Sequence, residues 1–220
     1  MTSFGVVARV RRTLTEEYNR DTIPGVKRRR LKVGHTGTLD PFATGLMILL
    51  IGKATKRSNE FLKLDKVYEA TIHLGQTSST GDPEGDITDV NPRIPTGQEI
   101  RQVLERFVGE IQQVPPIYSA IKIDGERAYK RARKGETVDM PSRTVTIHSI
   151  ELLDYAYPEL KIRTHVSSGT YIRTLAEDIG SILEVGAYCT ALRRIRVGQV
   201  SIDQATALDV FTRSGREEKI

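Results

Sequence analysis

The apolar residues of this chain follow two different spacings, and the chain switches between them repeatedly along its length. A spacing of three and four predicts a helix over residues 3–18, and strict alternation predicts a strand over residues 67–74. Other strands are expected at 46–51, 117–123, 145–155, 160–166, 189–197 and 199–202, and other helices at 54–64, 98–107, 126–134, 170–183 and 203–211. The order of these strands and helices along the chain lacks the regular strand–helix–strand repeat of parallel sheets. We therefore expect an α+β fold with a mixed, mainly antiparallel sheet flanked by helices.

The remaining segments are rich in turn-forming residues and are expected to be loops. Residues 19–32 are basic, residues 33–45 contain three glycines, and residues 75–91 are polar. The last segment is seventeen residues long, which indicates a function or disorder. Thr96 and Glu99 show the spacing of a capping box, and Ser3 is a candidate N-cap for the first helix.

Composition excludes several classes of protein. The longest apolar run, residues 46–51, is far shorter than the ~20 residues of a membrane span. Cys189 is the single cysteine, which rules out an intramolecular disulfide and a cysteine-rich zinc site and indicates a reducing, cytoplasmic location. We expect it to be a buried structural thiol. The four histidines (35, 73, 148 and 165) have no metal-ligand spacing, so neither a metal nor a cofactor is expected.

The formal net charge is +5, and the clustering of the cations is more informative than their total. Basic groups occur at residues 27–32, 127–134 and 193–196. Three separated groups suit a phosphate backbone that crosses a surface, and solvated faces are the alternative. Charge alone does not separate these two interpretations.

The segment most indicative of chemistry is GHTGTLDPFATG, residues 34–45. Its glycines permit a close approach of the backbone to a ligand, and Pro41 restricts Asp40 to extended geometry. A carboxylate presented in this way suits a nucleophile or a general base. The alternative is a structural Asx turn, because Asp-Pro is a common turn dipeptide.

This segment resembles the catalytic motif of the TruB family of tRNA pseudouridine synthases, and four other segments resemble further motifs of that family. They follow in family order between about residue 3 and residue 205: KVYEA with LG at 66–75, VPPIYSAIK at 114–122 with Gly125 and Tyr129, SGTYIRTLA at 168–176, and LRR at 192–194. The resemblance implies a pseudouridine synthase fold with the active-site cleft across the sheet.

The resemblance also implies a reaction and its residues. The activity would be that of an isomerase, converting uridine 55 in the T-arm loop of tRNA to pseudouridine without cofactor or metal, after the base is flipped out. By this resemblance Asp40, Tyr68 and Arg173 are catalytic. Substrate would be bound by His35, Tyr68, Tyr171, Leu192 and Lys122.

Each of these residues also has an ordinary structural interpretation. Tyr68, Tyr171 and Leu192 are compatible with plain packing, Arg173 with a phosphate contact or a surface helix position, and His35 with a hydrogen bond within its loop. Two other functions stay open. One is a guide-RNA-dependent synthase subunit, and the other is an RNA-binding or RNA-folding protein whose catalysis is lost or incidental.

For domain organisation, we expect a catalytic domain over residues 1–205 and a short tail over 206–220. Compared with the family, the expectation is that the usual N-terminal strand and a C-terminal PUA-type module are lacking. A monomer with tRNA as partner and no membrane association is expected.

Overall fold

The computed structural model describes residues 1–23, 26–117, 122–123, 126–128, 131 and 140–212. Within them, one large sheet organises the chain, and all its neighbouring strands are antiparallel except the short parallel pair β2–β12. In spatial order its strands are β13 (Val200–Ser201), β12 (Ala187–Val197), β4 (Lys66–Leu74), β11 (Glu159–Val166), β10 (Arg143–Ala156) and β7 (Gly109–Gln113), with β2 (Thr44–Gly45) against β12. The expected α+β class with a mainly antiparallel sheet is confirmed.

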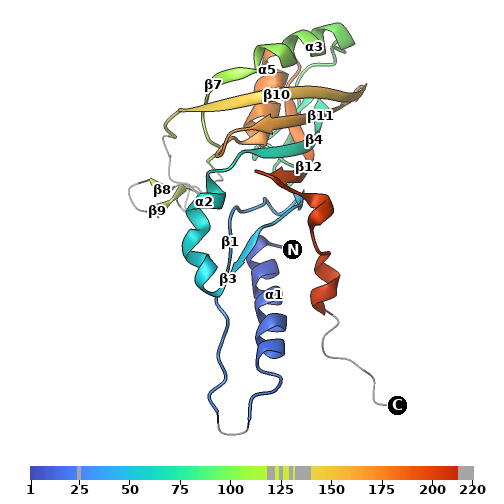
Figure 1. The fold of residues 1–220 in the computed structure, drawn as a ribbon. Helices are drawn as coiled ribbons and strands as arrows, with labels where there is room; N and C mark the ends of the chain where they lie inside the picture. Colours follow the sequence, from blue (N-terminus) through green and yellow to red (C-terminus); the bar gives the residue numbers. More distant parts are fainter. Residues whose placement is uncertain (24–25, 118–121, 124–125, 129–130, 132–139, 213–220) are drawn as a thin grey trace, which may run out of the picture.

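Two helices cover one face of the sheet and enclose the core (Figure 1). These are α3 (Gly97–Arg106) and α5 (Ile172–Ile182). The alternation in β4 has the predicted phase, since Ala70, Ile72 and Leu74 are buried on this face. The capping box of Thr96 and Glu99 at the start of α3 is also confirmed.

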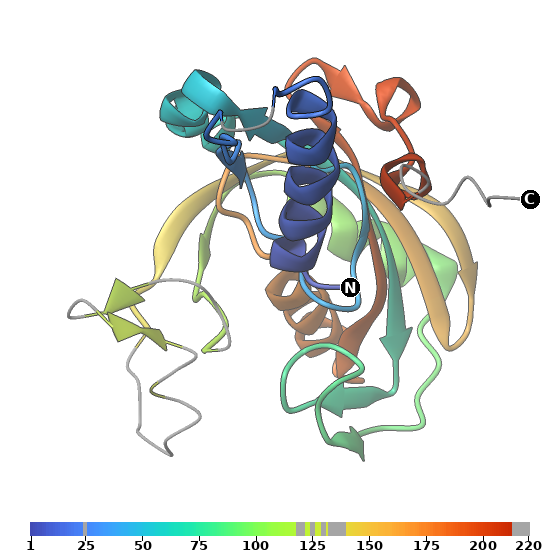
Figure 2. The same ribbon diagram turned by 90° about the horizontal axis from the view of Figure 1, so that it is seen from below.

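A second layer lies beyond the β12 side of the sheet (Figures 1 and 2). It contains α1 (Ser3–Tyr18) and a two-stranded sheet of β1 (Val33–His35) and β3 (Leu49–Ile51). The N-cap of α1 is Thr2, whose hydroxyl accepts from the Gly5 N–H; Ser3 was the wrong choice, because its side chain turns to another segment. After β3 the chain forms a 3₁₀ turn and α2 (Ser58–Leu62), where one helix was expected.

The structure corrects the predicted loop of residues 75–91, which contains a hairpin of β5 (Gln76–Ser78) and β6 (Ile87–Asp89). All of β6 is exposed, so its sequence carries no apolar alternation. Likewise the predicted loop 33–45 includes β1 and β2, and only residues 49–51 of the predicted strand 46–51 are in a strand.

Other differences are smaller. β7 was not predicted, and Glu126–Arg127 is a strand, β9, paired with β8 (Lys122–Ile123), where the start of a helix was expected. The β10–β11 hairpin around Pro158 and the β12–β13 pair agree with prediction. The predicted C-terminal helix is two 3₁₀ turns, Ile202–Gln204 and Leu208–Thr212. Over the described residues, every helix is too short or too polar to cross a membrane.

Candidate active site

The site forms around Asp40, whose loop is held from both sides. Before it, the Ser3 hydroxyl accepts from the Leu39 N–H at 2.9 Å and donates to the Leu39 carbonyl at 3.2 Å. After it, the Ala43 N–H donates to the Asp40 carbonyl at 3.0 Å and closes a backbone turn. The carboxylate itself faces Arg173 of α5, across the chain, so the Asx-turn interpretation does not describe its main contact.

Arg194 of β12 fastens the two ends of this loop to the sheet. Its buried guanidinium donates to the carbonyls of Leu46, at 2.8 Å, and Gly37, at 3.2 Å, while its own carbonyl accepts from the Leu46 N–H at 2.7 Å. Gly45 passes so close that a Cβ would lie 2.2 Å from the Arg194 carbonyl oxygen. The loop carrying Asp40 is therefore built into the sheet edge.

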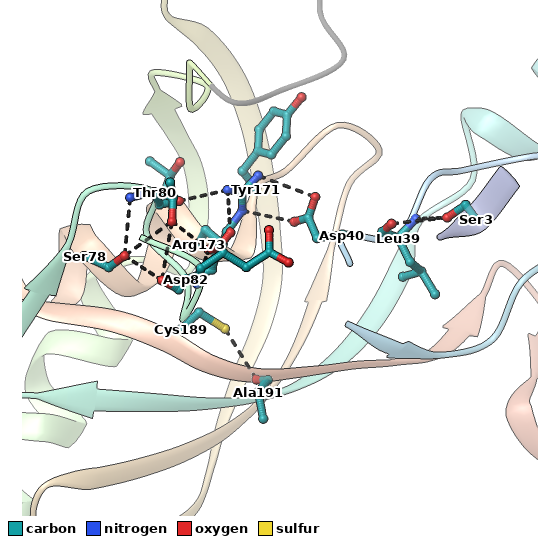
Figure 3. A network of polar contacts seen from close by, with 12 residues as sticks. Ser3, Leu39, Asp40, Ser78, Thr80, Asp82, Tyr171, Arg173, Cys189 and Ala191 are labelled. Carbon is teal, nitrogen blue, oxygen red and sulfur yellow. Dashed lines mark hydrogen bonds and ion pairs between the residues drawn. The ribbon is translucent and has the colours of Figure 1, made fainter. Parts of the chain in front are cut away.

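Arg173 lies between two carboxylates (Figure 3). Its Nε is 3.0 Å from Oδ2 of Asp40, and its Nη1 is 2.9 Å from Oδ2 of Asp82. Nη1 also donates to the Thr80 carbonyl at 2.8 Å. The side chains of Arg173 and Asp82 are 4 % and 5 % exposed, against 33 % for Asp40. Arg173 thus has a buried anchor on one side and a solvent-accessible carboxylate on the other.

Asp82 is in turn held within the β5–β6 hairpin. Its carboxylate accepts from the Thr80 hydroxyl at 2.6 Å and from the Glu84 N–H at 3.0 Å, and its carbonyl accepts from the Ser78 hydroxyl at 2.5 Å. This hairpin therefore orients the arginine that faces Asp40.

Burial controls the protonation of the site. It raises the pKa of Asp40, and the adjacent Arg173 guanidinium offsets this only in part, with Asp82 adding to the rise. Burial also raises the pKa of the Tyr68 phenol, against the opposing effect of Arg194. Asp40 is close enough to add to that rise through its charge. Tyr68 faces the same side of the sheet as Arg194, its cross-strand neighbour in β12.

The other expected site residues are placed as follows. His35 is in β1, where its Nδ1 accepts from the Gly37 N–H at 3.3 Å; burial, followed by Arg194, lowers its pKa. Tyr171 precedes α5 beside Arg173 (Figure 3), with the Arg143 guanidinium 4.7 Å from its ring centroid. Leu192 is buried in β12 next to Ala70. The side chain of Lys122 lies outside the described residues.

Cys189 is fully buried, and its thiol donates to the Ala191 carbonyl at 3.4 Å. Burial raises the pKa of this thiol to about 12. The expectation of a buried structural cysteine is confirmed.

Sequence reasoning missed two residues of the site. Asp82 was one acidic residue in a polar loop, and no local pattern distinguishes it. Arg194 was grouped with Arg193 and Arg196 as a surface cation, but it is 3 % exposed while those two point outward. Alternation could have identified it, because residues 192 and 194 share a face of β12.

Comparison with known proteins identifies the family. The family model "TruB family pseudouridylate synthase (N terminal domain)" matches residues 25–172, and "tRNA pseudouridylate synthase B C-terminal domain" matches residues 173–217. A Burkholderia mallei protein named tRNA pseudouridine synthase B is 49 % identical over 188 residues, with 86 % of this chain and 62 % of that protein covered. A protein of the same name from Cupriavidus pinatubonensis is 52 % identical over 184 residues, with 82 % of this chain and 58 % of that protein covered. The chain thus spans about three fifths of these relatives' length.

Solved structures agree with this assignment. The crystal structure of a Cbf5-Nop10-Gar1 complex contains a chain that matches with a TM-score of 0.68 and 31 % identity, covering 96 % of this chain and 50 % of that one. A chain in the structure of an H/ACA RNP bound to a substrate RNA containing 2'-deoxyuridine matches with a TM-score of 0.63 and 28 % identity, covering 99 % and 53 %. By the family models that together cover residues 25–217, the chain belongs to the TruB family of pseudouridylate synthases.

Proposed function

We propose that this chain is a tRNA pseudouridine synthase that isomerises uridine 55 of the T-arm loop. The observation that carries the proposal is the ion pair between half-buried Asp40 and buried Arg173, with Arg173 anchored on Asp82. A binding protein has no need of a partly desolvated carboxylate on a loop that is fastened at both ends. An enzyme that must present a reactive carboxylate does.

The reaction is balanced without any co-reactant. The bond from C1′ of the ribose to N1 of uracil breaks, the base rotates, a bond from C1′ to C5 forms, and the proton on C5 leaves while N1 gains one. Asp40 acts in its ionised form, either by covalent attack on the sugar or the base or by taking a proton from the ribose. Arg173, which stays protonated, holds the Asp40 carboxylate in place and stabilises its charge.

In this proposal Tyr68 receives the extruded uracil. Its ring stacks on the base, which offsets part of the few kcal/mol needed to flip a nucleotide by about 1–3 kcal/mol. Burial raises the pKa of its phenol, so the hydroxyl stays protonated and acts as a donor; it can take the proton from C5 only as it gives its own proton to another group. The pocket surrounds the flipped base and the space that it leaves in the RNA stack. It is completed by Tyr171, Leu192 and His35.

A groove of arginines provides a surface for the RNA backbone. Six arginines from α1 and the following loop line it: Arg11, Arg12, Arg20, Arg28, Arg29 and Arg30. The loop is fixed against α1, because buried Asn19 donates to the Arg29 carbonyl at 2.9 Å and accepts from the Arg29 N–H at 3.0 Å. Pre-positioned guanidinium groups suit phosphate contacts. Because Ser3 at the start of α1 bonds to Leu39, the helix that lines the groove also contacts the loop that carries Asp40.

The test is pseudouridine formation on an unmodified T-arm stem-loop carrying tritium at C5 of its uridines, with no guide RNA present. Isomerisation at C5 releases the label to water. Stoichiometric release from the single target uridine supports the proposal. Release that requires a guide RNA and partner proteins would instead indicate a guide-dependent subunit of a larger assembly. Binding without release would indicate an RNA-binding protein.

A further inference from the structure

Three side chains of types that can ligate metals lie close together on the more exposed face of the sheet, opposite its buried core. Nε2 of His148 is 3.2 Å from Oδ2 of Asp65, and Nε2 of His165 is 3.9 Å from the same oxygen. The two imidazole rings have centroids 4.6 Å apart. One ligand atom from each residue lies within 4.8 Å of the other two. Spacing along the sequence does not reveal this cluster, because antiparallel pairing joins residues that the sequence separates.

The backbone directs these side chains toward one another. The β10–β11 register shifts between Ile147 and Ser149, so His148 is the extra residue of a β-bulge, while Ser149 pairs with His165. A bulge re-aims a side chain and is over-represented at functional sites. The bulge therefore brings the imidazole of His148 to the ring of His165.

The third member is held by its own contacts. The Asp65 carbonyl accepts from the Gly198 N–H at 2.8 Å. The next residue, Lys66, donates from Nζ to the carbonyls of Leu62, at 2.6 Å, and Leu64, at 2.5 Å. These bonds fix the turn into β4, so Asp65 reaches the histidines from a constrained position.

We propose that Asp65, His148 and His165 form a binding site for a divalent transition-metal ion of the zinc type. Two imidazoles and one carboxylate are a ligand set that suits such ions and leaves a position for water. In a tetrahedral zinc site with bonds of about 2.0–2.2 Å, the ligand atoms are about 3.3–3.6 Å apart. The observed separations reach these values with small side-chain movements. The side chains are 32–44 % exposed, so an ion has access.

The bound ion would tie the start of β4 to the β10–β11 hairpin. Arg196 of β12 acts electrostatically on His165, and its positive charge lowers the affinity of the site for a cation. Oxygen-preferring Mg²⁺ is not expected to bind, because two of the three ligands are nitrogen. The proposal is independent of the proposed catalytic function.

The test is titration of the metal-free chain with Zn²⁺ by calorimetry, and with Co²⁺ by visible absorption. We expect one saturable site with d–d bands typical of low coordination number, and no response to Mg²⁺. His148→Ala and His165→Ala should each weaken Zn²⁺ affinity at least about tenfold. His73→Ala is the matched control, because His73 lies in β4 against Tyr188, outside the cluster. Buried Cys189 does not compete for the ion.

NMR of the imidazole nitrogens provides a measurement that needs no variant. Zn²⁺ should shift Nε2 of His148 and His165 and leave His73 unchanged. The proposal is overturned if the chain shows no saturable site, if both alanine variants bind Zn²⁺ as tightly as the parent chain, or if His73 shifts equally. In each of those cases the three residues form only a hydrogen-bonded cluster.

Discussion

At the scale of single residues, Asp40 and Asp82 contact the same arginine but have different environments. Asp82 is almost fully buried and bonded within its hairpin, whereas a third of the Asp40 side chain reaches solvent. The pKa of Asp40 is raised because burial outweighs the help from Arg173. The fold therefore holds Asp40 in a charged form that its surroundings disfavour, as expected for a reactive group.

Asp40→Asn should unfold at a temperature equal to or higher than that of the parent chain at neutral pH. A carboxyl whose folded pKa is raised binds more protons folded than unfolded, so its contribution to stability falls as pH rises through that range. The advantage of the variant should accordingly be small at pH 3 and larger at pH 7. Thermal unfolding of both proteins across this range measures it. The account is contradicted if the unfolding temperature of the variant, measured relative to that of the parent chain, is lower at pH 7 than at pH 3.

Asp82→Asn should behave in the opposite way. Removing one partner of a buried ion pair leaves the Arg173 charge poorly compensated, which costs about 3 kcal/mol. We expect a clear loss of stability in denaturant unfolding, together with a fall in kcat, because Arg173 is then free to turn from Asp40. An equally stable variant with normal kcat would show that Asp82 does not position Arg173.

At the scale of elements, the loop that carries Asp40 depends on close contact between β2 and β12. Sequence reasoning identified the loop from its glycines and Pro41 but not its attachment, because the attachment is made by Arg194, which lies far along the chain. The strands of the main sheet were predictable where one face is buried, as in β4. The β5–β6 hairpin was not, because β6 is exposed throughout and the buried groups of the hairpin, Ser78 and Asp82, are polar.

Gly45→Ala tests this attachment, with Gly52→Ala as the matched control. Both glycines have positive φ, +102° and +61°, but a Cβ at Gly52 meets no atom within 4 Å, whereas at Gly45 it meets the Arg194 backbone. Gly52→Ala should cost about 1 kcal/mol from the backbone conformation alone. Gly45→Ala should cost at least about 2 kcal/mol more and also lower activity. Equal losses in denaturant unfolding would contradict close packing at Gly45.

At the scale of the whole molecule, basic groups that look alike in sequence have different surroundings in the structure. Residues 28–30 join α1 in one groove, Arg194 turns inward, and residues 129–130 and 132–134 of the second group lie outside the described residues. Charge counting left nucleic-acid binding and solvated faces both open and could not separate these roles, because burial depends on strand alternation and tertiary pairing. The proposed catalytic residues were singled out only because the resemblance extends over several motifs. Their ordinary interpretations were equally compatible with local physics.

Arg12→Gln with Arg28→Gln should weaken binding of full-length tRNA and reduce its salt dependence. Each lost phosphate contact lowers the slope of log affinity against log salt by about 0.7–0.9, so the pair should lower it by about 1.5. Arg101→Gln with Arg106→Gln, on α3, removes the same charge from outside the groove and should leave the slope nearly unchanged. Equal slopes for the two double variants would show that the groove does not contact RNA.

The central claim is that Asp40 performs chemistry on a bound RNA. The most direct measurement compares the parent chain with Asp40→Asn for both binding and single-turnover pseudouridine formation on the T-arm stem-loop. The account predicts equal affinity, within about a factor of two to three, and no detectable product from the variant. Substantial pseudouridine formation by Asp40→Asn would contradict the assignment of Asp40 and, with it, the reading of the Asp40–Arg173–Asp82 arrangement as an active site.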